Sequence, residues 1–146
     1  MGRKKATGRR ERGTFFGLPH AVMDSPNYTQ LSSKGVRLLN DLGRQFNGSN
    51  NGDLCAAWSV MEKRGWKSRS TLHYAIQELL HFEFVTQTRQ GGRHKCSLYA
   101  LTWLAIDECK GKLDVNETNV ASGKWKESKA KFLPKQNGKH QFDCSI

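Results

Sequence analysis

The sequence predicts an α+β fold in which three helices are followed by a β-hairpin, with basic, disordered segments at both ends. The first observation is an apolar stripe at helical spacing within residues 69–81. The second is a helix pattern just upstream that stops at Gly65, and the third is a strand–Gly-Gly–strand pattern just downstream. The stripe consists of Leu72, Ala75, Ile76, Leu79 and Leu80.

Upstream of this stripe, the chain predicts a first long helix preceded by a short helical turn. Ala21 to Asp24 fit a single turn, which Pro26 prevents from continuing. Ser32 is a suitable N-cap for a helix over residues 33–46. The Asn- and Gly-rich residues 47–52 then predict a turn, because these residues tolerate positive φ.

The second and third helices are expected to follow closely. Residues 53–54 predict a short strand, and residues 56–64 predict a helix that Gly65 terminates as its C′ residue. Trp66 and Lys67 form the turn, after which Ser68 is the best N-cap for the helix that carries the apolar stripe.

A hairpin is predicted after the third helix. Residues 82–89 and 96–101 are rich in aromatic and β-branched side chains, which favour strands. Gly91 and Gly92 lie between them and are expected to supply the positive φ of a tight hairpin turn at residues 90–93. Residues 103–109 predict either a short closing helix or an extension packed on the first long helix.

The charge distribution favours a polyanionic partner. The formal net charge is +11, and it is concentrated at the ends of the chain. Residues 1–12 contain six basic residues and one acid, residues 13–109 contain ten and eight, and residues 110–146 contain eight and four. Basic segments that flank a nearly neutral domain favour nucleic acid first and an anionic membrane second. No apolar run approaches the roughly 20 residues of a membrane span, so a membrane partner is not expected.

These features divide the chain into three parts. We expect a disordered basic arm over residues 1–14, a folded domain over residues 15–109, and a basic, mostly disordered tail over residues 110–146. Trp125 or Phe132-Leu133 could dock part of that tail on the domain.

The sequence carries no pattern of catalytic or metal-binding residues. Its four cysteines, Cys55, Cys96, Cys109 and Cys144, are widely and irregularly spaced, without a CxxC pair. We therefore expect reduced thiols in a cytoplasmic protein, and no metal or other cofactor. No Gly-rich phosphate loop or Ser-His-Asp arrangement can be placed, so an enzyme is not expected.

The polar face of the third helix predicts contact with DNA. An α-helix fits the major groove of B-DNA when its apolar back holds it on a domain and its polar front reaches the base edges. Arg69 suits a guanine and Gln77 suits an adenine, whereas residues near the helix start suit phosphate. The alternative is a solvated amphipathic helix in a three-helix core. The predicted contact residues of this helix and its turn are Lys67, Ser68, Arg69, Ser70, Thr71, His73, Tyr74 and Gln77.

The predicted hairpin tip is also basic. Arg89, Arg93, His94 and Lys95 gather there, and beside the third helix they could follow the DNA backbone or minor groove. The alternative is that these charges only keep the exposed tip soluble. The aromatic residues are expected in the core, with a stacking platform for single strands as the less favoured interpretation.

The chain resembles the winged helix-turn-helix family over about residues 31–103. The resemblance lies in the run Gly65-Trp66-Lys67-Ser68-Arg69-Ser70-Thr71-Leu72 and in two strands, Phe84-Val85 and Tyr99-Ala100-Leu101. The turn in this chain is one residue longer than that of the family, and the extra residue is Lys67. The leader over residues 18–26, followed by Leu31-Ser32, is similar to leaders of winged-helix proteins carried by prophages and plasmids.

This resemblance implies double-stranded DNA as the partner, in transcription regulation or replication initiation of a bacterium or mobile element. It also implies a replication or transcription protein, and a second copy of the chain in a homodimer, as candidate partners. A non-catalytic protein-docking module within a larger complex remains open as an alternative, and RNA binding is a third hypothesis.

Overall fold

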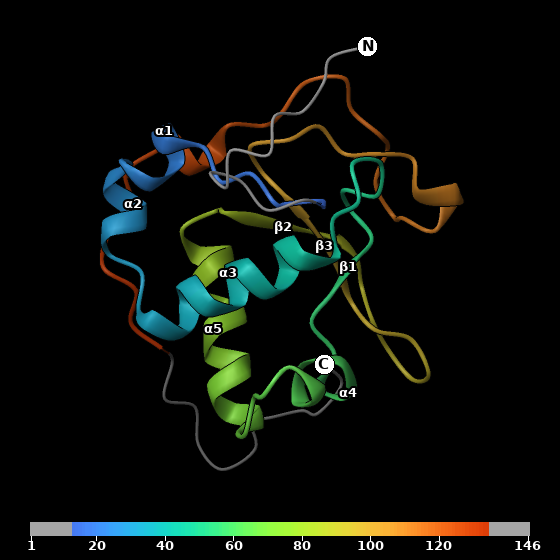
Figure 1. The fold of residues 1–146 in the computed structure, drawn as a ribbon, viewed down its shortest axis with the longest axis horizontal. Helices are drawn as coiled ribbons and strands as arrows, with labels where there is room; N and C mark the ends of the chain where they lie inside the picture. The colour runs from blue at the N-terminus through green and yellow to red at the C-terminus, as the bar shows by residue number, and fades with distance from the viewer. Residues whose placement is uncertain (1–12, 135–146) are drawn as a thin grey trace.

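The computed structural model describes residues 13–134, and in that part of the chain it contains five α-helices and one three-stranded antiparallel sheet (Figure 1). The predicted α+β class is therefore confirmed. The basic arm predicted over residues 1–14 lies outside the described residues, apart from Gly13 and Thr14. The elements, in chain order, are α1 (His20–Met23), α2 (Pro26–Thr29), α3 (Ser33–Gln45), β1 (Leu54–Cys55), α4 (Trp58–Lys63), α5 (Arg69–His81), β2 (Val85–Arg89), β3 (Leu98–Leu101), η1 (Cys109–Gly111) and η2 (Lys124–Lys126).

The two predicted N-caps begin the two long helices. The Ser32 hydroxyl accepts a hydrogen bond from the amide of Gly35 at 3.1 Å, and the Ser68 hydroxyl accepts one from the amide of Thr71 at 3.3 Å. Each cap satisfies an amide that has no partner within its helix. The short turn α1 ends before Pro26, as predicted, but Pro26 then starts the second short helix, α2, which the sequence pattern did not indicate.

The sheet places the hairpin strands beside the short strand that precedes α4. Its order is β1-β3-β2, with Leu54 opposite Tyr99 and Val85 opposite Leu101. All four residues of β3 are buried, because this strand lies between the other two. The helices α3 and α5 pack against each other and against the sheet.

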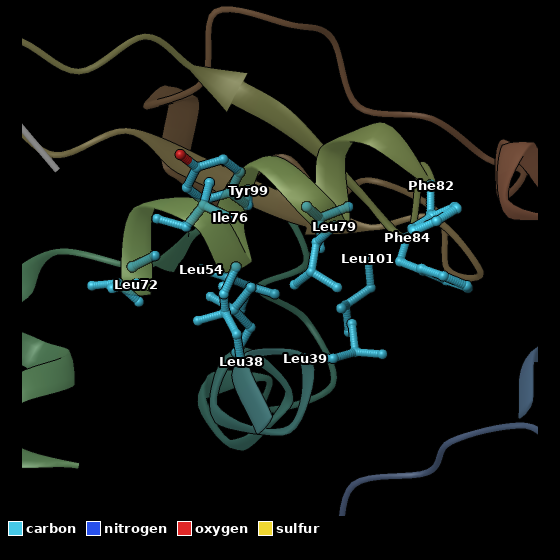
Figure 2. Close-up of a cluster of buried hydrophobic side chains, with 14 of the residues drawn as sticks. Leu38, Leu39, Leu54, Leu72, Ile76, Leu79, Phe82, Phe84, Tyr99 and Leu101 are labelled. Carbon is cyan, nitrogen blue, oxygen red and sulfur yellow. The ribbon is translucent and has the colours of Figure 1, made fainter. Parts of the chain in front are cut away.

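The core forms where the apolar faces of α3 and α5 meet the sheet (Figure 2). The stripe predicted on α5 faces this core: its members are buried, except Leu80, which is half-buried. The largest fully buried side chains include Leu38, Leu39, Leu42, Leu54, Met61, Leu72, Leu79, Phe82, Phe84 and Leu101. This packing holds α5 on the domain with Arg69 and Gln77 exposed on the side away from the core.

The hairpin turn differs from its prediction. Neither Gly91 nor Gly92 has a positive φ; His94 does, at 65°. The tip residues Arg93 and His94 form a turn closed by a bridge between Gly92 and Lys95. A Cβ atom at Gly91 would collide with the backbone amide of Ser97, so this glycine is required for close approach of the two arms.

Residues 103–108 form no helix, so the closing-helix prediction is wrong; they form an extension that reaches α3 only through Phe16. The ring of Trp103 lies beside that of Phe16, with 6.0 Å between centroids, and Phe16 covers Gly43 of α3. The amide of Asp107 donates to the carbonyl of Asn51 at 2.9 Å. Hydrogen bonds to another loop thus replace those of a helix.

The tail differs from the expectation of disorder over residues 110–134. Trp125 is buried, and the side-chain Nδ2 of the fully buried Asn27 donates to the carbonyls of Trp125 and Glu127 at 2.9 and 2.6 Å. In return, Asn27 Oδ1 accepts from the amide of Lys129 at 2.9 Å. These contacts satisfy the tail backbone as a strand partner would. Trp125 was one of the two predicted docking points; residues 135–146 lie outside the described part.

None of the helices between residues 13 and 134 combines the length and the apolar composition needed to cross a membrane.

Candidate nucleic-acid interface

The turn between α4 and α5 sets the position of the candidate recognition helix. Gly65 has φ 95°, and its amide and that of Trp66 donate to the carbonyls of Glu62 and Met61, which closes the end of α4. A Cβ atom at Gly65 would lie 2.8 Å from the guanidinium of Arg37, which is the end of a flexible side chain and can shift, so it is the positive φ that requires glycine here.

A buried carboxylate fixes this turn to α3. Asp41 accepts hydrogen bonds from Nε1 of Trp66 at 2.7 Å and from Nε and Nη2 of Arg64 at 3.2 and 3.1 Å. Arg37, one turn earlier on α3, donates to the carbonyl of Arg64 at 2.7 Å. The turn therefore has three anchors on one helix, and the start of α5 is held by α3.

The polar face of α5 contains most of the predicted contact residues. Arg69 and Gln77 are exposed, and Ser70, His73 and Tyr74 are half-buried. The structure thus brings these five predicted residues together on one helix, opposite the core. His73 and Tyr74 lie next to each other, with 6.2 Å between ring centroids.

Two edges bound this face. At one edge, the Arg69 guanidinium lies 5.5 Å from the ring centre of Trp58 on α4, within the range of a cation–π contact. At the other edge, Thr71 and Tyr74 line a hollow that also contains Phe132 and Pro134 from the end of the described chain. Arg69 is therefore oriented by an aromatic ring, and Thr71 is partly covered.

The turn residues divide into free and engaged groups. Lys67 is exposed, whereas the Ser68 hydroxyl accepts the N-cap hydrogen bond and lies 2.9 Å from the hydroxyl of Ser70. Ser68 therefore serves the helix start first, and a phosphate would compete with that hydrogen bond.

The single carboxylate of α5 is turned inward. Glu78 is 6% exposed, and its two oxygens accept from the amide and the hydroxyl of Ser32 at 3.1 and 2.7 Å. It lies at the N-terminus of α3, where the helix dipole favours negative charge. Although Glu78 directly follows Gln77 of the polar face in the chain, the structure places its carboxylate against α3, so α5 exposes no acid.

The hairpin tip exposes three of its four predicted contact residues. Arg93, His94 and Lys95 are exposed. Arg89 is half-buried, and its Nε and Nη2 donate to the carbonyl of Cys96 at 3.3 and 2.8 Å. Arg89 therefore joins the two arms of the hairpin, and its guanidinium is less available to a ligand than the tip. The hairpin projects toward the same end of the molecule as α4 and the start of α5 (Figure 1).

The structure adds two basic residues that sequence analysis missed. Lys34 and Arg37 lie on α3 with their charged groups 5.6 and 5.3 Å from the ring centre of the buried Trp66. Both therefore lie beside the turn that leads to α5. Their spacing with Asp41 places all three on one face of a helix, which the sequence could have indicated.

Among the described residues, no three His, Cys, Asp or Glu side chains are grouped closely enough to hold a metal ion. Comparisons with protein-family models, with curated proteins and with solved structures found no match to this chain.

Proposed function

We propose that this chain binds double-stranded DNA sequence-specifically, with α5 in the major groove and the hairpin tip on the adjacent backbone or minor groove. One observation carries the proposal: from residue 63 to residue 106, every exposed charged residue is basic. This stretch has only two acids, Glu78 and Glu83. Glu78 is buried against α3, and Glu83 forms a 2.9 Å ion pair with Lys129. Its cations are Lys63, Arg64, Lys67, Arg69, Arg89, Arg93 and Lys95.

The order of the elements supports the same proposal. The chain runs α3–β1–α4–α5–β2–β3, and the sheet order is β1-β3-β2. This arrangement is compatible with a winged helix, whose second and third helices form the helix-turn-helix and whose hairpin is the wing. In such a fold the face of α5 that carries Ser70 and Gln77 would meet the bases.

Each side chain has a proposed role that follows from its position. Arg69, oriented by Trp58, is proposed to pair with a guanine, and the exposed Gln77 with an adenine. Lys67 and the tip residues Arg93 and Lys95 are proposed to contact phosphates, which set the register but carry no sequence information.

The cellular role that we propose is transcription regulation or replication initiation, in the cytoplasm of a bacterium or of a cell that carries a mobile element. Both roles use the same contacts to DNA. They differ in the second partner, which would be a transcription or a replication protein. Binding at many promoters or at one origin, measured by genome-wide occupancy, would distinguish them.

Two variants test the proposed contacts: one removes a single charge from α5, and the other removes two charges from the hairpin tip. Arg69→Ala should lose about 1–3 kcal/mol on the preferred duplex and relax the base preference, because it removes a base contact. Arg93→Ala with Lys95→Ala should weaken all duplexes similarly and lower the log–log salt slope by about 2 units, because it removes phosphate contacts.

The measurement is enrichment from a random duplex library, followed by fluorescence-anisotropy titration of the selected duplex and of an RNA duplex of the same sequence. Preference for DNA, and a changed selection with Arg69→Ala, would support the proposal. A silent Arg69→Ala would show that the base-reading face is assigned wrongly. Equal binding of RNA would favour the RNA alternative.

A further inference from the structure

Two cysteines that are far apart in the sequence lie in contact beside the hairpin. Cys55 ends β1, and Cys96 lies two residues before β3. β1 and β3 pair antiparallel, with Cys55 opposite Leu98, and the thiol of Cys55 donates a hydrogen bond to the sulfur of Cys96 at 3.0 Å. Both side chains are half-buried and both thiols are free. The pattern of β-strand pairing therefore holds the two sulfurs together.

The third described cysteine takes no part in this pair. Cys109 lies at the start of η1, and its thiol is 3.7 Å from the carbonyl of Asn51. Its burial, and the neighbouring carboxylates of Asp53 and Asp107, raise its pKa. Within the described part of the chain, Cys55 and Cys96 thus each have one sulfur partner, and Cys109 serves as an internal control.

We propose that Cys55 and Cys96 form a reversible disulfide, a modification site that takes a low-molecular-weight disulfide as its oxidant. The sulfurs need to approach by only about 1 Å to reach the length of an S–S bond. The backbone beside them is already set by the β1–β3 hydrogen bonds, so side-chain rotation accounts for most of this movement.

The chemistry at the two sulfurs is unequal. Nη2 of Arg89 donates to Cys96 Sγ at 3.9 Å, so the guanidinium lies directly beside this sulfur. Burial and the hydrogen bond to Cys96 raise the pKa of Cys55 to about 11, so Cys55 stays protonated at neutral pH. We therefore assign Cys96 as the sulfur that meets the oxidant and Cys55 as the sulfur that resolves it.

The steps balance as ordinary thiol–disulfide exchange. The Cys96 thiolate attacks one sulfur of the external disulfide, forms a mixed disulfide and releases one thiolate. Cys55 then gives its proton to solvent and attacks the Cys96 sulfur, which forms the Cys55–Cys96 bond and releases the second external thiol. Two protein thiols are oxidised, and one external disulfide is reduced to two thiols.

The bond would connect residues that are 41 apart, and the loop that it closes contains α4, α5, β2 and the hairpin tip. It would attach the return arm of the hairpin covalently to β1. The mobility of the hairpin would then depend on the thiol–disulfide balance around the protein. This inference rests on the sulfur geometry and holds whether or not the chain binds DNA.

The test uses the full chain, reduced and then equilibrated with mixtures of oxidised and reduced glutathione. After acid quenching and alkylation, peptide mass spectrometry identifies which cysteines are joined. We expect a peptide in which Cys55 and Cys96 are linked, two hydrogens lighter than the reduced pair. In native buffer this link should form at a ratio of oxidised to reduced glutathione at least tenfold lower than in urea. We also expect a rise in Tm of about 10 °C on oxidation.

Single variants separate the pair from the other thiols. Cys55→Ser and Cys96→Ser should abolish the link, whereas Cys109→Ser and Cys144→Ser should leave it unchanged; circular dichroism checks that each variant folds. The proposal fails if the native chain keeps Cys55 and Cys96 unlinked in excess oxidised glutathione, carries separate glutathione adducts on them, or forms the bond no more readily than the urea-unfolded chain. A fall in Tm on oxidation would also contradict it.

Discussion

Asp41→Ala tests whether the start of α5 is fixed through the buried carboxylate on α3. In the native protein this carboxylate accepts from Trp66 Nε1 at 2.7 Å and from two nitrogens of Arg64. The substitution leaves the indole N–H, which is buried with Trp66, without a partner. A hydrogen bond to a charged group contributes about 1.5–3 kcal/mol.

The Arg64 contact adds less, because 47% of its side chain is exposed and solvent screens the pair. We assign it about 0–1 kcal/mol. The expected loss in the free energy of unfolding is therefore about 1.5–4 kcal/mol. Asp41→Asn keeps an acceptor oxygen for the indole N–H, so its expected cost is about 1 kcal/mol, the charge-assisted part of the hydrogen bond.

Denaturant unfolding monitored by circular dichroism measures these free energies. The cycle with Trp66→Phe isolates the central contact, because phenylalanine has no N–H to leave unpaired. In the Trp66→Phe background, Asp41→Ala should cost about 1.5 kcal/mol less than in the wild type. A loss below about 0.5 kcal/mol for Asp41→Ala in the wild type would refute the assignment, and additivity in the cycle would show that Trp66 is not its main partner.

Two further predictions concern stability. Gly35→Ala should destabilise the fold by about 1–3 kcal/mol, because the new Cβ would collide with Oε1 of Glu78 and displace it from Ser32. Gly17→Ala, where no atom lies within 4 Å of the new Cβ, should change the free energy of unfolding by less than about 0.5 kcal/mol; equal effects in urea titrations would contradict the close-packing argument. The pKa of Cys55 is raised by burial from the model-compound value of 9.0 to about 11, so the unfolded chain ionises first as pH rises. Under reducing conditions, stability should fall between about pH 9 and pH 11, and Cys55→Ser should reduce that fall; an identical decline in the variant would show that other groups cause it.

Local features of the fold could be predicted because their causes are local. Ser32 and Ser68 cap helices through an amide three residues away, and the apolar stripe of α5 repeats at the helical period. Gly65 ends α4 because its φ of 95° suits glycine. For the same reason, five of the predicted contact residues on α5 share one face; these are Arg69, Ser70, His73, Tyr74 and Gln77.

The remaining features depend on residues that are far apart in the chain. In the sequence, Asp41 has the pattern of a solvent-facing residue, because its partner Trp66 lies 25 residues later in the chain. Likewise, Asn27 binds the backbone of Trp125, 98 residues later, so a tail poor in apolar side chains packs where composition predicted disorder. The paired glycines predicted a hairpin, but not that His94 adopts the positive φ, because the pairing of the two arms decides this.

The measurement that tests the central claim most directly is the affinity of the full chain for duplex DNA as a function of salt concentration. Lys34, Lys67, Arg93 and Lys95 are exposed and lie on α3, the turn and the hairpin tip. If each releases about one counterion, the slope of log affinity against log salt concentration should be about −4 or steeper. Affinity should then fall at least about a hundredfold between roughly 50 and 200 mM salt. A flat response, or no binding to duplex DNA at the lower concentration, would contradict the DNA-binding proposal and favour protein docking.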